Sequence, residues 1–470
     1  MEQNLKSGID SLSRDRISEL PETLRLHILS FLPTEDCIRT SLIAKGWRYL
    51  WKFVSSLNFN YSDDHTSTAL VREREKFLNF VDQVFMLRDS SDLYEFCLYY
   101  RSLRKSLSKS TVRSFNLWVA VALKLRAKKL CLHLYPESSV LELPSSRTLE
   151  VLSLTWGTIN LQNLSQLCEL RTLELVAVGA PSESFSNDLF SYCPALETLR
   201  FLGCDFSEWS LMCISAPSLK NIFLDECEWD DCVIKVSAPS LQRLHVNDCV
   251  WDNDCTIEVS AQRLNSFKYG FRSLPKSFVF QGLVSVDSAV ISSLGACFDY
   301  DDIEASKVRF MLGGLLNIRK LNLDIDSDVV FERLPPFDCM EELTVPLYHC
   351  ICDDYVNSVI KFLNSNCKMQ TLNISEFVDR SDFHYDGDEH CCSQVNGRQK
   401  FTLHLLKKLV VKFWKRDDKE IEWVELLKSN SPHLNEVIRI NSFGQEDEEE
   451  GMEDEEEEED MEDEGGQWPG

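Results

Sequence analysis

Three cysteines recur at a nearly constant spacing in the middle of the chain, and they are the first residues whose type and pattern suggest chemistry. They are Cys204, Cys227 and Cys249. Thiolates are common zinc ligands, but structural zinc sites usually bring close pairs such as Cys-x-x-Cys, and this sequence contains none. The spacing instead predicts the same place in a repeated unit, where a small buried group hydrogen-bonds the turning backbone. We therefore expect a structural role for these cysteines and no bound metal.

The other combinations of reactive residues give weaker evidence for a metal site or an active site. Two further His/Cys clusters are His349, Cys350 and Cys352, and His384, His390, Cys391 and Cys392. Neither cluster has a regular zinc spacing. The sequence also lacks a Gly-rich phosphate loop with a Lys, a Gly-x-Ser-x-Gly turn and a His-Glu-x-x-His pair. We predict a non-catalytic protein with no metal and no cofactor.

The cysteines belong to a longer repeated unit. The segment Ile214–Leu219 (ISAPSL) recurs as Val236–Leu241 (VSAPSL) and, less closely, as Val259–Leu264 (VSAQRL). The shared frame Leu-x-x-Leu-x-Leu-x-x-Cys comprises Leu196, Leu199, Phe201, Cys204; Leu219, Ile222, Leu224, Cys227; and Leu241, Leu244, Val246, Cys249. An aromatic residue follows two positions after each cysteine, at Phe206, Trp229 and Trp251. A frame of this kind with a period of roughly 22–26 residues is typical of leucine-rich repeats, whose short strands stack into a continuous core.

Weaker units extend the repeat in both directions. They start at Leu149, Leu170, Ile318, Met340 and Met369. The register breaks between about Gly270 and Leu312, so we expect an irregular insert or degenerate units there. The segment Cys232–Ser237 alternates apolar and polar residues, which favours a second short strand on the outer side of the central units over a helix.

The strand residues between the framework leucines should face the concave surface of such a solenoid. The central position of each unit is occupied by Ser153, Glu174, Arg200, Phe223, His245, Lys268, Asn322 and Thr344 in turn. Arg200, Phe223 and His245 stand in adjacent units, and Lys268 follows in the next one. Side by side, the guanidinium of Arg200, the ring of Phe223 and the imidazole of His245 could contact a partner in several ways. We therefore predict that this row is a target-binding stripe. The alternative is a solvated sheet face without a partner.

The elements that precede the repeats are short helices with large apolar residues. In the segment 14–54, Pro21 suits the first position of a helix, and Leu24, Ile28 and Phe31 follow at helical spacing. We expect Thr34 to cap a second helix, which carries Ile38 and Leu42. Trp47, Leu50, Trp51 and Val54 predict a third helix. So many large apolar groups on so little chain indicate either that a partner buries some of them or that the segment is a subdomain packed on the body.

This segment resembles the plant-type F-box. The resemblance rests on DRISELP at the start, ILSFLP in the middle and WRYLW at the end. It implies that the positions for packing or for gripping a Skp-type adaptor are Leu20, Pro21, Leu24, Ile28, Leu32, Pro33, Ile38, Leu42, Trp47, Leu50 and Trp51. One departure is Ala44-Lys45-Gly46-Trp47, where the family commonly has Ser-Lys-Arg-Trp. The missing side chain at Gly46 would weaken the adaptor contact and leave the apolar anchors in place.

The C-terminal part has its own pattern. Leu405–Trp414 alternates like a strand, Asp418–Asn430 has the apolar spacing of a helix, and a last strand runs through Val437, Ile438 and Ile440. This layout resembles the FBD domain that follows the repeats in many plant F-box proteins. Beyond it, every position from 446 to 464 except Gly451, Met452 and Met461 is Asp or Glu. This segment should be a disordered, solubilising tail.

Charge and hydropathy exclude several classes. The net charge is −27, and it is −11 without the acidic side chains of the tail, so no basic surplus favours nucleic-acid binding. The N-terminal segment MEQNLKSGID lacks the apolar core of a signal peptide, and no apolar run approaches the roughly 18 residues of a membrane span. The cysteines are therefore expected to be reduced thiols in the nucleus and/or cytoplasm.

These observations predict an α+β protein. Its expected parts are a disordered N-terminus (1–13), a three-helix F-box (14–58), a connecting helical and first-strand region (59–119), a leucine-rich-repeat solenoid of stacked parallel strands (120–345), an FBD-like α/β region (346–443) and an acidic tail (444–470). The resemblance to the F-box implies the function of a substrate-recognition adaptor of an SCF-type (Skp–cullin–F-box) ubiquitin ligase, with a Skp-type adaptor, through it a cullin, and an unidentified target protein as partners. The alternative is an acidic-tailed leucine-rich-repeat protein that binds histones or other basic proteins.

Overall fold

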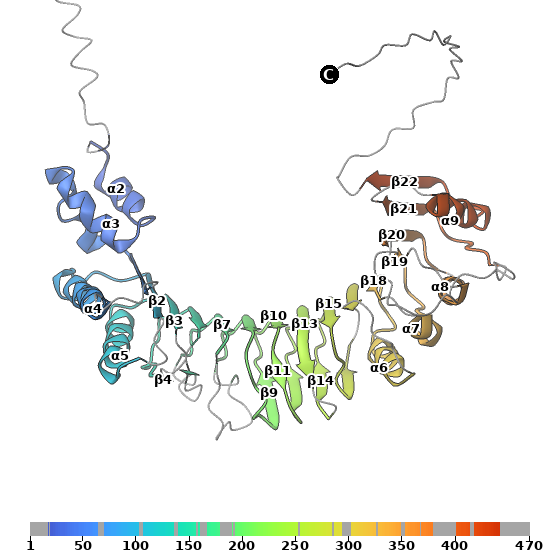
Figure 1. Ribbon diagram of the computed structural model, residues 1–470, viewed down its shortest axis with the longest axis horizontal. Helices are drawn as coiled ribbons and strands as arrows, with labels where there is room; N and C mark the ends of the chain where they lie inside the picture. The colour runs from blue at the N-terminus through green and yellow to red at the C-terminus, as the bar shows by residue number, and fades with distance from the viewer. Residues whose placement is uncertain are drawn as a thin grey trace, which may run out of the picture.

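The structure is a computed structural model. It describes residues 17, 19–63, 70–102, 107–135, 140–156, 158–159, 167–178, 190, 193–251, 254–283, 286–293, 302–325, 328–348, 353–366, 368–378, 401–413 and 418–441. The chain forms an arch whose inner side is lined by strands, with the N-terminal helices at one end and the C-terminal strands at the other (Figure 1).

The N-terminal module contains α2 (Glu22–Leu29) and α3 (Thr34–Arg39), followed by the 3-10 turns η1 (Thr40–Leu42), η2 (Lys45–Trp47) and η3 (Leu50–Phe53). The predicted third helical segment is present as the two short 3-10 helices η2 and η3, which contain Trp47 and Trp51, and not as one α-helix. The predicted Thr34 cap is wrong. Pro33 occupies the N-cap position, and the Thr34 hydroxyl instead accepts a hydrogen bond of 2.8 Å from the backbone N–H of Asn58, which ties α3 to the first strand.

One parallel sheet runs through the whole arch. Its strands are β1 (Ser56–Asp63), β2 (Glu95–Ser102), β3 (Lys129–Tyr135), β5 (Val151–Thr155), β7 (Thr172–Val176), β8 (Thr198–Leu202), β10 (Asn221–Asp225), β13 (Arg243–Trp251), β15 (Ser266–Phe271), β17 (Ser288–Ser293), β18 (Lys320–Asp324), β19 (Glu342–Tyr348), β20 (Thr371–Val378), β21 (Lys408–Phe413) and β22 (Glu436–Asn441). They pair in chain order, as stacked repeats require. The ladder continues past both predicted limits of the solenoid, 120 and 345.

The central units return through a second, outer sheet of β9 (Leu211–Ser215), β12 (Val233–Ser237), β14 (Thr256–Ser260) and β16 (Ser277–Gln281). The predicted outer strand at 232–237 is confirmed. The inner ladder also passes without interruption from β15 through β17 to β18, so a degenerate unit, and no break, lies between Gly270 and Leu312. The short strands β4 (Val140–Leu141) and β6 (Thr158–Ile159) pair with each other, and β11 (Glu228–Trp229) pairs with the end of β13.

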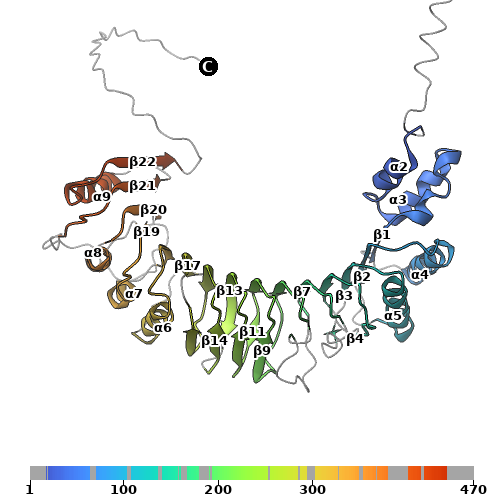
Figure 2. The same cartoon turned by 180° about the vertical axis from the view of Figure 1, so that it is seen from behind.

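Helices cover the outer side of the arch at both ends (Figure 2). They are α4 (Leu70–Leu87) and α5 (Lys109–Lys124) near the N-terminal module, and α6 (Asp302–Gly313), α7 (Asp328–Arg333), α8 (Asp353–Ser365) and α9 (Asp418–Ser429) toward the C-terminus. The length of the repeat unit explains why the outer element is a strand in the central units and a helix at the ends. The central register partners Asn221 and Arg243 stand much closer in sequence than Ser56 and Glu95, which are separated by the whole of α4. A helix advances about 1.5 Å per residue and a strand about 3.3 Å, so a helical return needs more chain.

The core lies between the inner sheet and the outer elements. The framework positions of the central units are buried, including Leu199, Ile222 and Leu244, which are register partners on β8, β10 and β13. Behind them the aromatic residues form a stack. Trp229 lies 5.3 Å from Phe206 and 4.6 Å from Trp251 between ring centroids, with interplanar angles of 22° and 6°. The repeat thus buries large planar groups face to face.

The repeated cysteines are buried and hydrogen-bond the turning backbone, as predicted. The Cys204 thiol donates to the carbonyl of Leu175 (3.4 Å), and the Cys249 thiol donates to the carbonyl of Leu224 (3.4 Å), each in the preceding unit. The Cys227 thiol donates to Asp225 O (3.2 Å). The pKa of the Cys227 thiol is raised, and burial is the largest cause of the rise.

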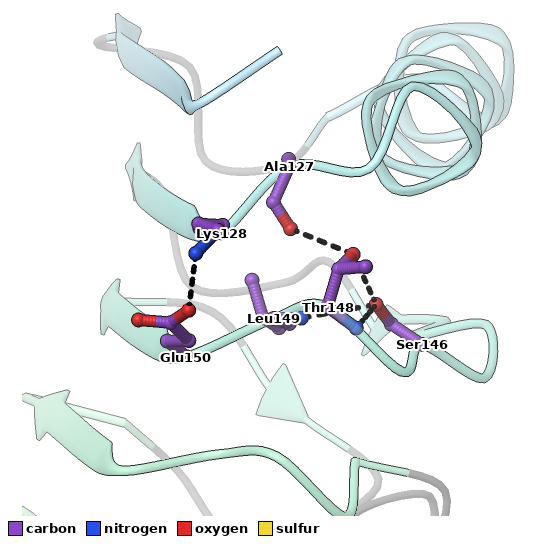
Figure 3. A network of polar contacts seen from close by, with 6 residues as sticks. All are labelled: Ala127, Lys128, Ser146, Thr148, Leu149 and Glu150. Carbon is purple, nitrogen blue, oxygen red and sulfur yellow. Dashed lines mark hydrogen bonds and ion pairs between the residues drawn. The ribbon is translucent and has the colours of Figure 1, made fainter. Parts of the chain in front are cut away.

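The turn before each inner strand repeats one hydrogen-bond pattern. The carbonyl of Lys128 accepts from the N–H groups of Glu150 and Val151, and the carbonyl of Glu150 accepts from the next unit in the same way. Figure 3 shows the side chains that reinforce this rim, where Lys128 Nζ pairs with Glu150 Oε1 at 2.7 Å and Thr148 donates to the Ala127 carbonyl. The Ser146 hydroxyl accepts from the backbone of Thr148 and Leu149, which closes the turn.

The C-terminal elements β21, α9 and β22 confirm the predicted strand, helix and strand. The acidic tail, residues 1–13 and both sequence clusters of His and Cys at 349–352 and 384–392 lie outside the described residues. Within the part of the chain that the structure describes, no helix is both long and apolar enough to cross a membrane.

Candidate functional site

The N-terminal module presents an unusual number of large apolar side chains to solvent. Nearly half of the exposed large hydrophobic residues among those described lie between positions 17 and 53: Ile17, Leu24, Ile28, Phe31, Leu42, Ile43, Tyr49 and Phe53. Leu42 is 88% exposed and Phe31 74%. A soluble protein rarely leaves such groups uncovered unless they contact a partner.

Helix α2 shows how the sequence produces this surface. Leu24, Ile28 and Phe31, the last just beyond the helix end, follow at i, i+4 and i+7, and all three are exposed. The helix attaches to the module through Leu29, which is fully buried, with Leu26 packed beside it. The apolar stripe predicted from the sequence therefore points outward.

The predicted adaptor-binding residues divide by exposure. Pro21, Leu24, Ile28, Pro33 and Leu42 are exposed, and Leu20, Leu32 and Ile38 are half-buried. Trp47, Leu50 and Trp51 are buried and form the core of the module with Leu29 and Val54. These three belong to the packing of the module and not to its surface, because the tight turns η2 and η3 direct them inward.

Gly46 has a neighbour that the sequence does not indicate. The Arg25 guanidinium on α2 donates a hydrogen bond of 2.6 Å to the Gly46 carbonyl, and it lies 5.9 Å from the centre of the Trp47 ring. A Cβ built on Gly46 would stand 2.8 Å from Arg25 Nη1. The guanidinium thus occupies the space beside Gly46 and places a cation there from a different element of the module.

The module is fastened to the solenoid at two points. The Thr34 hydroxyl accepts a hydrogen bond from the backbone N–H of Asn58 on β1. The Arg88 side chain, just beyond α4, donates a hydrogen bond to the carbonyl of Val54. Burial lowers the pKa of Arg88. These two hydrogen bonds, together with the shared apolar core, join the module to the first strand and to the end of α4.

The second predicted site lies on the inner sheet. Register pairing aligns Glu174, Arg200, Phe223, His245 and Lys268 on five neighbouring strands. The predicted row therefore exists as one continuous stripe of the concave face. Val290 of β17 continues it and was not predicted, because its unit lacks the leucine frame.

Contacts within the stripe hold its side chains in place. The Arg200 guanidinium lies 4.6 Å from the centre of the Phe223 ring, and Glu174 is 3.9 Å from Arg200 Nε. The Phe223 and His245 rings meet edge to face with centroids 5.9 Å apart. This arrangement presents a stacked cation and two rings to any group that enters the arch.

The surroundings of His245 shift its pKa downward. Burial lowers the pKa of His245, and Lys268 and Arg200 on either side lower it further, whereas Asp225 at 3.9 Å raises it. Its Nε2 has no hydrogen-bond partner in the structure. This nitrogen is buried, so the imidazole takes part in the stripe through its contact with the Phe223 ring.

A third group of reactive residues was missed by sequence reasoning. Glu95 and Cys97 of β2 and Cys131 of β3 have ligand atoms that all lie within 4.8 Å of one another. The interaction between the two thiols raises the pKa of Cys97 and lowers that of Cys131. The two cysteines are distant in sequence, with α5 between them, and only the strand register could have revealed the pair.

Comparison with known proteins agrees with both parts of the architecture. Residues 17–59 match the F-box domain, and residues 86–291 match the LRR repeats of the FBD-associated F-box protein At5g56370.

Three relatives from Arabidopsis thaliana illustrate the likeness. The chain is 34% identical to F-box/FBD/LRR-repeat protein At3g52680 over 46% of each chain, and 28% identical to F-box/FBD/LRR-repeat protein At1g78750 over 71% of this chain and 72% of that protein. It is 30% identical to F-box/LRR-repeat protein At3g26922 over 47% of this chain and 70% of that protein. The match thus spans less than half of At3g52680 and over two thirds of At3g26922. The inward leucine frame, the short N-terminal helices and these matches together show that the chain belongs to the plant F-box/LRR-repeat family.

Proposed function

We propose that this chain is a non-catalytic substrate-recognition adaptor of an SCF-type ubiquitin ligase, acting in the nucleus and/or cytoplasm. The F-box would bind a Skp-type adaptor and through it a cullin, and the concave sheet would bind a target protein for ubiquitination.

The outward apolar face of the F-box carries this proposal. Binding energy at protein interfaces concentrates in a few large side chains that become fully desolvated. Leu24, Ile28 and Phe31 along α2 and at its end, and Leu42 on η1, are such side chains, already exposed and held on short, fixed elements. Covering them would remove the largest concentration of exposed apolar groups in the part of the chain that is described.

The test is capture of a Skp-type adaptor by the purified full chain. Leu24→Ala with Phe31→Ala should weaken binding at least about 100-fold, since two desolvated anchors of roughly 1.5–3 kcal/mol each are removed. The matched control is Phe310→Ala with Leu405→Ala, two exposed apolar residues far from the F-box, which should leave binding unchanged. Equal capture by both double variants would overturn the proposal.

The target site is proposed on the concave stripe of Arg200, Phe223, His245 and Lys268. Its support is the alignment of these side chains on neighbouring strands and their mutual contacts. Changing Arg200, Phe223 and His245 together to Ala should abolish target capture while the Skp-type adaptor still binds. Unchanged captured partners would place target recognition elsewhere on the arch.

The acidic tail supports a second candidate, a binding protein for histones or other basic partners. Removal of the acidic segment 446–464 should leave adaptor capture unaltered if the first proposal holds. Under the second candidate the same deletion would abolish binding to core histones, that binding would fall steeply with salt, and the F-box variants would be silent.

A further inference from the structure

We propose that Glu95, Cys97 and Cys131 form a zinc site on the concave sheet beside the F-box. Side-chain atoms of these residues that can coordinate a metal lie within 4.8 Å of one another, and no other cluster of at least three His, Cys, Asp or Glu residues among those described meets this condition. The inference is independent of the proposed function.

The strands position the three ligands rigidly. Cys97 and Cys131 are register partners on adjacent parallel strands, and Glu95 precedes Cys97 by two positions, so all three project from the same face of the sheet. The alternate residues Phe96, Leu98 and Leu130 are buried in the core and fix the strands from behind. Cys97 is half-buried and Cys131 is 9% exposed, so the site is sheltered but open to the concave face.

The surroundings of Glu95 are those of an oriented metal ligand. The Ser56 hydroxyl donates to one carboxylate oxygen at 3.1 Å, and the Lys129 ammonium lies 2.6 Å from the other. Carboxylates that bind metals are commonly held by such outer hydrogen bonds. The Lys129 ion pair also competes with a cation for one oxygen of Glu95, so metal coordination has to use the oxygen facing the thiols or displace Lys129.

Charge and donor type select the ion. Two thiolates and one carboxylate carry three negative charges, which one divalent cation and the Lys129 ammonium balance. Thiolate donors with one carboxylate suit Zn²⁺, which prefers four ligands in a tetrahedron. Binding releases one proton from each thiol, and the fourth position is left for water or for a side chain of a bound protein.

Spectroscopic titration of the full chain with Co²⁺, followed by displacement with Zn²⁺, tests the site. The protein is kept with a phosphine reductant so that both cysteines are thiols. Wild-type protein should show thiolate-to-cobalt charge-transfer absorption that Zn²⁺ removes. Cys97→Ser and Cys131→Ser should each lose that absorption and weaken Zn²⁺ binding at least about 100-fold, and Ser56→Ala should weaken it roughly 10-fold through the outer hydrogen bond.

Two controls make the result specific. Cys213→Ser removes a half-buried cysteine from the outer sheet and should leave the absorption unchanged. Glu95→Gln preserves the size of the side chain and should weaken Zn²⁺ binding, because an amide oxygen is a poorer ligand than a carboxylate. The proposal is overturned if the reduced wild-type protein shows no charge-transfer band, or if the band persists in both serine variants.

Discussion

The F-box and the central repeats use the same kind of residue in opposite ways. In the units from 193 to 271, the leucines, phenylalanines and tryptophans of the frame point between two sheets and are buried. In the F-box, apolar residues at equally regular spacing point outward along α2, while a small core of Leu29, Trp47, Leu50 and Trp51 holds the module together.

The difference follows from what each element can pack against. A repeat unit has a neighbour on both sides and an outer layer behind it, so every large side chain finds an intramolecular partner. A few short helical segments enclose little volume and cannot bury all of their apolar groups. Regular apolar spacing therefore identifies an element, but the number of neighbouring elements decides whether its side chains serve folding or binding.

The largest expected effect on stability separates the two regions directly. Trp229→Ala should lower the free energy of unfolding by about 3–5 kcal/mol, because it opens a cavity between the stacked rings of Phe206 and Trp251. Phe31→Ala, which removes an exposed ring from the F-box, should change that free energy by less than about 0.5 kcal/mol. Chemical denaturation monitored by circular dichroism measures both. Equal losses would contradict the division between folding and binding surfaces.

The repeated cysteines give the next largest effect. Cys227→Ala should destabilise the solenoid by about 1–3 kcal/mol, since it leaves a small cavity and removes the hydrogen bond to the Asp225 carbonyl. The exposed Cys339 is the matched control, and Cys339→Ala should be nearly neutral. Zinc binding should be the same in Cys227→Ala and wild type, and a loss of metal with Cys227 would refute the structural role of these cysteines.

Arg25 tests how the F-box surface compensates for Gly46. Arg25→Ala should weaken binding of a Skp-type adaptor by roughly 1 kcal/mol, or about fivefold, because it removes the cation that stands beside Gly46. Isothermal titration with the full chain measures the change. Arg48→Ala, an exposed cation nearby, serves as the comparison. A stronger effect of Arg48→Ala than of Arg25→Ala would show that the guanidinium over Gly46 has no special part.

The smallest effect is a pH dependence from the concave stripe. Burial lowers the pKa of His245 in the folded protein below the unfolded value of about 6.5, so the unfolded chain takes up the proton first. The stability that His245 contributes is present above that unfolded value and is lost as the pH falls through the folded pKa. The free energy of unfolding should therefore fall less between pH 8 and 5 in His245→Gln than in wild type. Parallel profiles for the two proteins would show that His245 gains its proton equally well in both states.

The sequence by itself determined the repeat and most of its chemistry. The leucine frame predicted the inner strands, its last position identified the buried cysteines, and the alternation in 232–237 indicated an outer strand. It also aligned Arg200, Phe223 and His245, since a constant period places equivalent residues on neighbouring strands.

Other features depend on contacts between residues without a sequence relation. Trp47 and Leu50 were grouped with the adaptor-binding residues because spacing does not show which side of a turn faces the core. Thr34 does not cap its helix, because its hydroxyl accepts a hydrogen bond from the backbone N–H of Asn58 instead. That contact exists only because the F-box packs against β1. The limits of the solenoid were set too narrowly, because the longer units with helical returns obscure the period although their strands join the same sheet.

The position of Arg25 over Gly46 and the meeting of Glu95, Cys97 and Cys131 were decided by tertiary structure alone. In the first case a long side chain on α2 reaches across to the turn η2, and in the second the register of two strands distant in sequence brings thiols together. Sequence periodicity records which face of an element a residue occupies. It does not record the distance between side chains on different elements, which depends on how the whole chain packs.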